Sequence, residues 1–301
     1  MQLTVLGNGS GGPFQGRHYS AQVLELGGQV FMIDCGEGTQ MQIFKHRVRI
    51  DHCRQIFISH LHGDHVFGLM GLLTNWCLKQ RTASLEIYAP PGLQELVEHT
   101  SRLCGVRYPY PIHFVEVDAA QHALVFENKQ LEVWSIPLNH RMPTSGWLFR
   151  EKPKPRNILK SAIEQYEIPF TLIPGIKTGA DLQLPDGSII PNAALTKDPP
   201  APRAYAYCSD TAPSNAVLEA VRGVDLLYHE ATFSKAHAHE ASVSFHSTAE
   251  QAATAARVAG VGRLLLGHFS GRYQETDTLL QEARAIFPET YIAVEGERVV
   301  V

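Results

Sequence analysis

The sequence crowds four residues of metal-binding type into six positions. In "ISHLHGDHVFG" (residues 58–68) these are His60, His62, Asp64 and His65. One zinc ion normally accepts three or four protein ligands. Residues two apart in an extended segment point to the same side, which fits the first two histidines. The other two ligands follow a glycine that lets the backbone turn. The pattern therefore favours the beginnings of two metal sites over one.

Two such sites need further ligands from distant parts of the chain. His140, Asp210 and His268 each follow a short apolar run that is typical of a strand. A carboxylate has two oxygens and can face two cations, so Asp210 is the natural bridge. Two zinc ions about 3.5–4 Å apart would lower the pKa of a shared water from about 15.7 toward about 7 and supply hydroxide at neutral pH. We assign the remaining ligands to two sets: His60, His62 and His140, and Asp64, His65 and His268.

Strands and helices that could position these ligands can be read from the periodicity. Apolar runs such as "RQIFIS", "LEVWSIPLN", "RAYAYCS", "VDLLY" and "VGRLLLG" each lead to a residue of ligand type. Helical spacing occurs in "PPGLQELVEHTSRL" and "APSNAVLEAVRG", and "HSTAEQAATAARVAG" begins with an expected capping box of Ser247 and Glu250. We predict an α/β fold in which strand ends meet at one functional edge.

Composition narrows the class of protein. The chain has 301 residues, of which 44% are hydrophobic and 19% charged, as in globular proteins. A net charge of -4 gives no overall basic field toward nucleic acid, although it does not exclude a local patch. We expect no signal peptide and no membrane span. The five scattered cysteines lack a C-x-x-C pair and favour free thiols, so we expect a cytoplasmic protein.

Residues 151–202 break the pattern of the chain. They are rich in proline and show weak periodicity, apart from a short helix expected over 159–166 and a turn at Pro185-Asp186-Gly187. The segment begins with a basic run that includes Lys152, Lys154 and Arg156. We interpret it as an insertion into a single domain that spans residues 1–301.

Several motifs resemble those of a known family. "LGNGSGGP", "DCGEGTQ", "HLHGDH", "SDT", "HEATF", "HST" and "GHFSGRY" follow one another over nearly the whole chain. "HLHGDH" alone resembles the wide metallo-β-lactamase superfamily. The combination of "HEATF", "HST" and "GHFSGRY" is more specific and resembles ribonuclease Z, the short form of the tRNA 3′-processing endonucleases. The resemblance implies a metallo-β-lactamase fold, a four-layer αββα sandwich with a protruding arm insertion.

The resemblance also implies roles for individual residues. The seven ligands coincide with those of the family, and Asp64 would in addition act as general base. His246, backed by Glu230, would stabilise the scissile phosphate and protonate the leaving 3′ oxygen. Arg272 would help to hold phosphate. Residues 151–202 would form a flexible arm that grips tRNA, with three candidate phosphate contacts: Lys152, Lys154 and Arg156. This arm has "IPGIKTG" in place of the usual Gly-Pro and lysine-rich turn.

The expected function is removal of the 3′ trailer from precursor tRNA, which leaves a 3′-hydroxyl. The resemblance implies a homodimer with two Zn²⁺ per subunit and no organic cofactor. Mn²⁺ is the alternative metal, because these nitrogen and oxygen ligands suit both. One alternative function is a small-substrate metallo-hydrolase of the same fold, of phosphodiesterase or lactonase type. Another is a non-catalytic RNA-binding or metal-carrying protein. Deletion of the arm distinguishes the first alternative from tRNA processing, because the activity of a small-substrate enzyme should hardly change.

Overall fold

The computed structural model describes residues 1–12 and 16–301. They form two compact units. The first unit comprises Met1–Glu127, Glu132–Arg150 and Arg203–Val301, and the second comprises Asn128–Leu131 and Glu151–Pro202. Pro13, the last residue of the "LGNGSGGP" motif, lies outside the described residues. The ligand candidates all belong to the first unit.

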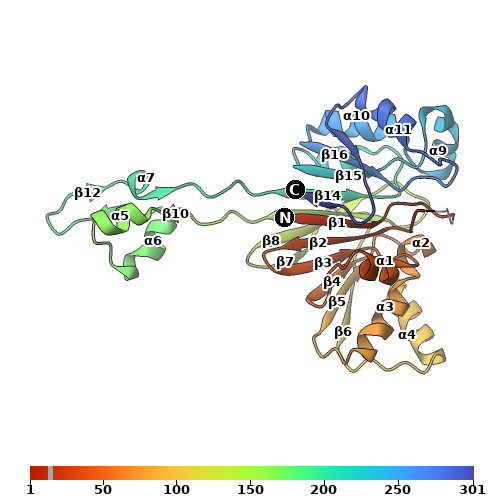
Figure 1. Cartoon of the computed structure of the whole chain (residues 1–301), viewed down its shortest axis with the longest axis horizontal. Coiled ribbons are helices and arrows are strands. Elements are labelled where there is room, and N and C mark those ends of the chain that lie inside the picture. The colour runs from red at the N-terminus through yellow and green to blue at the C-terminus, as the bar shows by residue number, and fades with distance from the viewer. Residues whose placement is uncertain (13–15) are drawn as a thin grey trace. The chain divides into compact units, whose positions relative to one another are not determined.

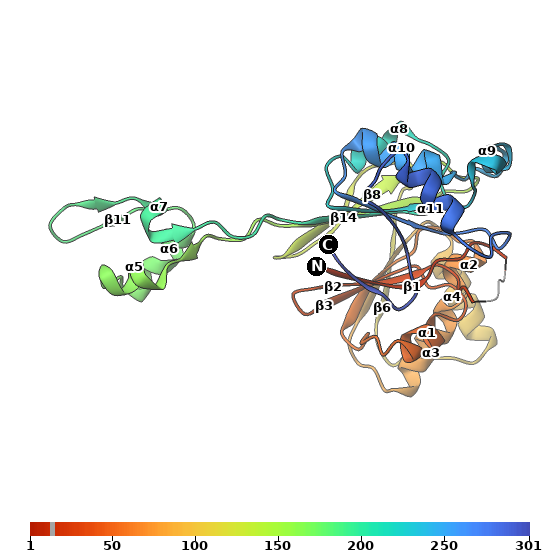
Figure 2. The same ribbon diagram turned by 45° about the horizontal axis from the view of Figure 1, so that its top comes forward.

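Two seven-stranded sheets form the centre of the first unit (Figures 1 and 2). The first sheet has the order β18(Arg298–Val300), β1(Gln2–Gly7), β2(Ala21–Leu26), β3(Gln29–Ile33), β4(Cys53–Phe57), β5(Leu85–Ala89) and β6(Ile112–Glu116). The second has the order β17(Thr290–Ile292), β16(Arg263–Gly267), β15(Leu226–Glu230), β14(Ala204–Cys208), β9(Ser145–Glu151), β8(Leu131–Pro137) and β7(Leu124–Glu127).

Helices flank both sheets and complete the four layers. The first sheet packs against α1(Thr39–Lys45), α3(Leu69–Leu78) and α4(Leu93–Leu103), with Leu72 and Val97 in the buried core. The second packs against α8(Asn215–Ala220), α10(Ala249–Ala259) and α11(Asp277–Arg284). The buried face of α10 is made of alanines, so this helix can lie close to the sheet. The α/β layers predicted from the sequence are confirmed.

An aromatic core joins the two sheets. Phe57 of the first sheet lies with its ring centroid 5.3 Å from those of Trp147 and Phe149 of the second. Phe31 lies 5.9 Å from Phe149, and all four side chains are fully buried. Each such pair contributes about 0.5–1.5 kcal/mol beyond the area it buries. The ends of these strands are therefore held in fixed positions by a dense core.

Parallel pairing brings the functional strand ends to one edge. β3, β4 and β5 run parallel in the first sheet, and β14, β15 and β16 run parallel in the second. Parallel strands have their carboxyl ends on the same side, so the residues that follow them meet there. The segments after β4, β14, β15 and β16 carry most of the candidate site residues.

The N-terminal cap of α10 differs from the expectation. The capping box consists of Thr248 and Gln251, one residue beyond the predicted Ser247 and Glu250. The Ser247 hydroxyl instead donates to the backbone oxygen of Thr211, 2.6 Å away. Because its hydroxyl makes this tertiary hydrogen bond, Ser247 does not cap α10 as the local spacing had predicted. Among the described residues, no helix combines the length and apolar character that crossing a membrane requires.

The second unit has a small core of its own. It contains β10(Asn157–Ile158), α5(Lys160–Gln165), η1(Phe170–Leu172), α6(Ile173–Lys177), β11(Leu182–Gln183), β12(Ile189–Ile190), α7(Asn192–Leu195) and β13(Thr196–Lys197). Ile168, Ile176 and Leu195 are buried in it. The predicted short helix is confirmed as α5. The predicted turn connects β11 to β12, with Gly187 at φ 88°.

Candidate metal centre

Loops at the strand ends deliver the seven candidate ligands. Asp64 and His65 lie in the short helix α2(Gly63–Val66). The other five follow strands: His60 and His62 after β4, His140 after β8, Asp210 after β14 and His268 after β16. The backbone turns sharply at His268, where φ is 56°. A non-glycine residue rarely adopts this conformation, and it commonly marks a functional position. Close packing at Gly36 helps to place α2, since a Cβ there would lie 2.3 Å from the Asp64 carbonyl oxygen.

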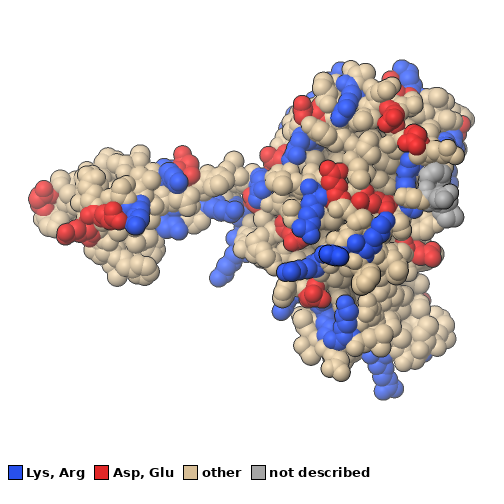
Figure 3. Space-filling view, in the orientation of Figure 1, with Lys and Arg blue, Asp and Glu red and all other residues tan. Residues whose placement is uncertain are grey.

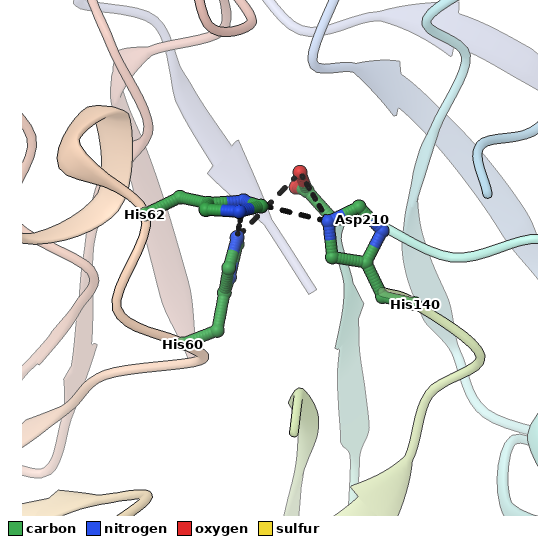
Figure 4. Close-up of side chains that lie close together, drawn as sticks. All are labelled: His60, His62, His140 and Asp210. Carbon is green, nitrogen blue, oxygen red and sulfur yellow. Dashed lines mark hydrogen bonds and ion pairs between the residues drawn. The ribbon is translucent and has the colours of Figure 1, made fainter. Parts of the chain in front are cut away.

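The first group consists of His60, His62, His140 and Asp210 (Figure 4). His62 Nδ1 lies 2.9 Å from His60 Nε2 and 3.4 Å from His140 Nε2. Asp210 Oδ2 lies 3.7 Å from His60 Nε2 and 3.9 Å from His140 Nε2. The four side chains come from both sheets and direct these atoms toward one point.

The second group consists of Asp64, His65 and His268. Asp64 Oδ2 lies 3.5 Å from Nε2 of each histidine, and the two Nε2 atoms are 3.4 Å apart. Asp210 Oδ1 lies 3.1 Å from both of these nitrogens. One oxygen of Asp210 thus faces each group, which is the arrangement of a bridging carboxylate.

The chemistry of this donor set fits two metal ions. Nitrogen ligands about 2.05 Å from a tetrahedral zinc ion would be about 3.3 Å from one another, and the separations above scatter around this value. The other ring nitrogens of His60, His65, His140 and His268 already contact hydrogen-bond acceptors. When these imidazoles are neutral, lone pairs face lone pairs within each group, and a cation relieves this repulsion; at His65 a proton can take the place of the cation.

Asp34 positions two of these histidines. It is fully buried, and its Oδ2 accepts from His65 Nδ1 at 2.7 Å and from Tyr207 Oη at 2.7 Å. It also accepts from the backbone N–H and the hydroxyl of Ser59, and that hydroxyl lies 3.0 Å from His60 Nδ1. Such contacts fix the tautomer and the orientation of a metal-binding imidazole. A single carboxylate therefore supports one ligand in each group.

Replacing Asp34 with alanine should lower the free energy of unfolding by about 3–5 kcal/mol, because several buried donors lose their acceptor. It should also weaken metal binding about 10–100-fold, the usual effect of losing such a partner. Urea unfolding and a zinc titration would measure the two effects. Asp51→Ala, at an exposed turn, is the matched control. Unchanged zinc affinity in Asp34→Ala would contradict this role.

Burial and neighbouring charges determine the protonation of three of the ligands, His60, His140 and Asp210. It lowers the pKa of His60 well below its ordinary value, and His65 adds to this effect. Burial likewise lowers the pKa of His140. Burial opposes ionisation of Asp210, but His268 and His65 still hold the pKa of this carboxyl well below its ordinary value. Neutral imidazoles and an ionised carboxylate are the forms that bind metal.

His65 differs from His60 and His140 in the direction of its pKa shift. Although burial opposes it, Asp210, Asp64 and Asp34 raise the pKa of His65 well above its ordinary value. A proton and a metal ion therefore compete for His65 Nε2. A metal ion bound there would displace this proton, so the affinity for metal would fall as the pH falls.

A second pair, His246 and Glu230, lies beside the two groups. His246 Nδ1 is 2.8 Å from Glu230 Oε1, and the glutamate is fully buried. Burial opposes protonation of His246, but Glu230 raises its pKa to about 9. The Glu230 carboxylate also accepts from Thr211 N and from the hydroxyl of Thr232. A ligand atom of His246 lies within 4.8 Å of those of Asp210 and His268.

The remaining four predicted residues are Arg272, Lys152, Lys154 and Arg156. Arg272 is exposed, and its guanidinium lies 5.0 Å from the centre of the Phe233 ring. Lys152, Lys154 and Arg156 belong to the second unit. Within that unit, Arg156 donates to Thr196 Oγ1 at 2.6 Å and to Asp198 Oδ1 at 2.5 Å. Arg156 therefore joins the two ends of the insertion, in addition to any contact with a substrate.

Sequence reasoning did not identify Asp34, Ser59 or Thr232 as parts of the site. Thr232 lies in "HEATF", and its hydroxyl is 2.9 Å from His268 Nδ1 and donates to Glu230. Asp34 follows a predicted strand, which is the signal that identified the ligands. A single carboxylate with no neighbouring ligand gave no reason to select it.

The chain resembles known proteins over its full length. It is 44% identical over 295 residues to Ribonuclease Z of Bacteroides fragilis (strain YCH46), covering 98% of this chain and 97% of that protein. The crystal structure of human tRNase Z, short form (ELAC1), matches with a TM-score of 0.70 and 27% identity, covering 100% of this chain and 99% of that one.

Two further matches concern the fold and the N-terminal half. The metallo-β-lactamase fold protein YhfI from Bacillus subtilis has a TM-score of 0.68 at 19% identity, over 99% of this chain and 98% of that one. The predicted metallo-β-lactamase fold is therefore confirmed. Residues 1–148 also match a family model described as Anti-Pycsar protein Apyc1.

Proposed function

The chain belongs to the ribonuclease Z family, and from this premise we propose that it is a zinc-dependent endoribonuclease that removes the 3′ trailer from precursor tRNA. One observation carries the chemical part of the proposal. Two groups of metal-type ligands share Asp210, and the His246–Glu230 pair lies beside them. That combination suits hydrolysis of a phosphodiester, which needs an activated water and a proton for the leaving oxygen.

His60, His62 and His140 would hold one zinc ion, Asp64, His65 and His268 the other, and Asp210 both. When bound, the two ions would supply a nucleophile at neutral pH and offset the charge of the phosphate. Asp64 is ionised, because His65 lowers the pKa of its carboxyl although burial opposes this. Its carboxylate orients the attacking water and accepts a proton from it.

His246 moves the second proton. Its Nδ1 is held by Glu230 Oε1, which leaves Nε2 as the atom that faces the substrate. A pKa raised to about 9 keeps the imidazole protonated at neutral pH. It can therefore stabilise the phosphate and donate a proton to the leaving 3′ oxygen, so that the tRNA ends in a 3′-hydroxyl.

We also propose that the second unit binds the body of the tRNA. Lys152 and Lys154 in its basic run are candidate phosphate contacts, and Arg272 near Phe233 is a candidate in the first unit. On the visible face of the first unit, positive and negative side chains are interspersed (Figure 3). The homodimer, the cytoplasmic location and Mn²⁺ as an alternative metal also belong to the proposal.

The test compares a 3′-extended precursor tRNA with bis(p-nitrophenyl) phosphate, using the full-length protein and a variant in which residues 151–202 are replaced by a short linker. We expect the variant to lose at least about 100-fold in kcat/KM on the tRNA, as several phosphate contacts disappear. Activity on the small ester should remain within about threefold and serves as the control for an intact centre. Equal cleavage of the small ester by both proteins, with no tRNA cleavage, would instead indicate a small-substrate hydrolase.

A further inference from the structure

A cavity lies between α8 and α10 and is separate from the metal ligands. Its volume is about 310 Å³, and its lining comes from the segment 213–218, from β15 and from one side of α10. Among the described residues that line it, none is one of the seven candidate ligands. Asn215 and Val258 are exposed members of the lining, so the cavity is open to solvent. Pockets of this volume hold small organic ligands, so there is room for one compact molecule.

His229 is a buried polar residue of this lining, with only 2% of its surface exposed. Its Nδ1 lies 2.8 Å from the backbone oxygen of Glu230, which can only accept, so the ring proton is on Nδ1. Burial lowers the pKa of His229 and keeps the imidazole neutral at pH 7. Among the described residues, none hydrogen-bonds to Nε2, although this atom is not fully enclosed. The cavity therefore contains an acceptor that lacks a donor.

Two hydroxyl groups of the lining are also restricted to accepting. Ser247 Oγ donates its hydrogen to the backbone oxygen of Thr211, 2.6 Å away. Thr254 Oγ1 donates to the backbone oxygen of Glu250, 2.8 Å away. A hydroxyl has a single hydrogen, so both oxygens can only accept from a ligand. Together with His229 Nε2, they favour an occupant that donates a hydrogen bond.

The charge of the lining selects further among donors. The described residues that line the cavity include no lysine, arginine, aspartate or glutamate. An anion would meet the lone pair of His229 and no cation. A cation would lie near Ser247 and Gln251 at the N-terminal end of α10, where the helix dipole is positive. Leu218 and Ala255 add apolar surface, so the lining favours a neutral ligand with an apolar body.

Gln251 adds one donor to these acceptors. Its Oε1 accepts from the backbone N–H of Thr248 at 2.9 Å, which leaves the NH₂ group of its amide to donate to a ligand. A hydroxyl group donates through its hydrogen and accepts at its oxygen. A hydroxyl is therefore the polar group that suits a lining with several acceptors, one amide donor and no charge.

We propose that this cavity binds a small neutral alcohol, whose hydroxyl donates to His229 Nε2 and whose apolar body packs against Leu218 and Ala255. His229 precedes Glu230 and Ser247 follows His246, so an occupant contacts both segments that hold the His246–Glu230 pair. The site goes beyond the proposed function and stands without it, because neither a metal ion nor RNA takes part in it.

Three probes with one apolar body test the proposal in the full-length protein. Cyclohexanol has the neutral donor, cyclohexyl methyl ether lacks a donor, and cyclohexylammonium carries a charged one. An NMR titration measures the three dissociation constants. We expect cyclohexanol to bind about threefold to tenfold more tightly than either of the others, the effect of one net hydrogen bond. In protein with ¹⁵N-labelled histidine, cyclohexanol should shift the Nε2 resonance of His229, and the ether should not.

Two variants and a matched control locate the binding. Ala255→Leu, which fills part of the cavity, should weaken cyclohexanol binding at least about tenfold. Arg257→Leu introduces the same residue on the exposed face of α10 outside the cavity and should keep the wild-type dissociation constant. His229→Phe removes the acceptor, so it should lower the affinity for cyclohexanol to that for the ether. Its spectrum also assigns the His229 resonance by difference.

Four results would overturn the proposal. No binding of cyclohexanol would refute the site, and equal affinities for cyclohexanol and the ether would refute the role of His229 Nε2. Tightest binding of cyclohexylammonium would refute the neutral class of ligand. Wild-type affinity in Ala255→Leu would place cyclohexanol elsewhere on the protein. If His229→Phe does not fold, the comparison of cyclohexanol with the ether in wild-type protein still decides the role of the imidazole.

Discussion

Replacing Asp210 with alanine is expected to reduce the metal content of both groups and to lower kcat/KM at least about 10³-fold. One oxygen of this carboxylate lies 3.1 Å from two nitrogens of the second group, and the other lies 3.7 and 3.9 Å from two nitrogens of the first. Metal ions contribute several kcal/mol of charge stabilisation to phosphoryl transfer, and each 1.36 kcal/mol corresponds to about tenfold in rate.

Elemental analysis would measure the metal content, and ester hydrolysis would measure the loss of kcat/KM. His62→Ala is the informative comparison, because His62 belongs to the first group alone. This substitution should reduce the metal content by about one ion per chain. Asp51→Ala should keep full occupancy. An Asp210→Ala protein that retained both ions would refute the bridging assignment, and one that lost a single ion would restrict Asp210 to one group.

His246→Ala should lower kcat on precursor tRNA about 10²–10⁴-fold while leaving metal content near wild type, since general acid catalysis has this magnitude. The loss should be smaller on p-nitrophenyl esters, whose leaving group needs no proton. In the proposed mechanism the protonated imidazole is the active form, so wild-type activity should fall as the pH rises through the pKa of His246. Glu230 raises that pKa and burial lowers it, so Glu230→Gln should move the alkaline limb of the pH profile to lower pH.

These measurements separate two roles for His246. Its ring lies among ligand atoms of Asp210 and His268, so a direct metal contact is the competing interpretation. Loss of one ion in His246→Ala would support that interpretation and exclude the role of proton donor. If the alkaline limb of the pH profile does not move in Glu230→Gln, the glutamate positions His246 without changing the pKa of its imidazole.

The sequence was informative where chemistry is concentrated in short motifs. His60, His62, Asp64 and His65 lie within six positions, and their types and spacing predict metal binding without any tertiary information. His268 could be added because a strand leads directly to it. Apolar runs of strand length are easy to recognise, and parallel strands bring their ends together. The edge that carries the site follows from these two facts.

Other parts of the site depend on contacts between distant segments. The cap of α10 shifted to Thr248 because Ser247 bonds to Thr211, 36 residues away. Asp34 contacts Tyr207 across the two sheets, and no local pattern marks that pair. Only the packing of the two sheets creates such features, so a single sequence without a structure does not reveal them.

The pairing of β1 with β18 has a consequence for synthesis of the protein. Leu3 lies opposite Val299, so the first sheet lacks this edge strand until residues 298–300 have been synthesised. The second group of ligands likewise requires His268, whereas the second unit ends at Pro202 and can fold earlier. The nascent chain is thus able to form the second unit before the second group of ligands is complete. A chain built in this order gains its candidate metal centre only after His268 has been synthesised.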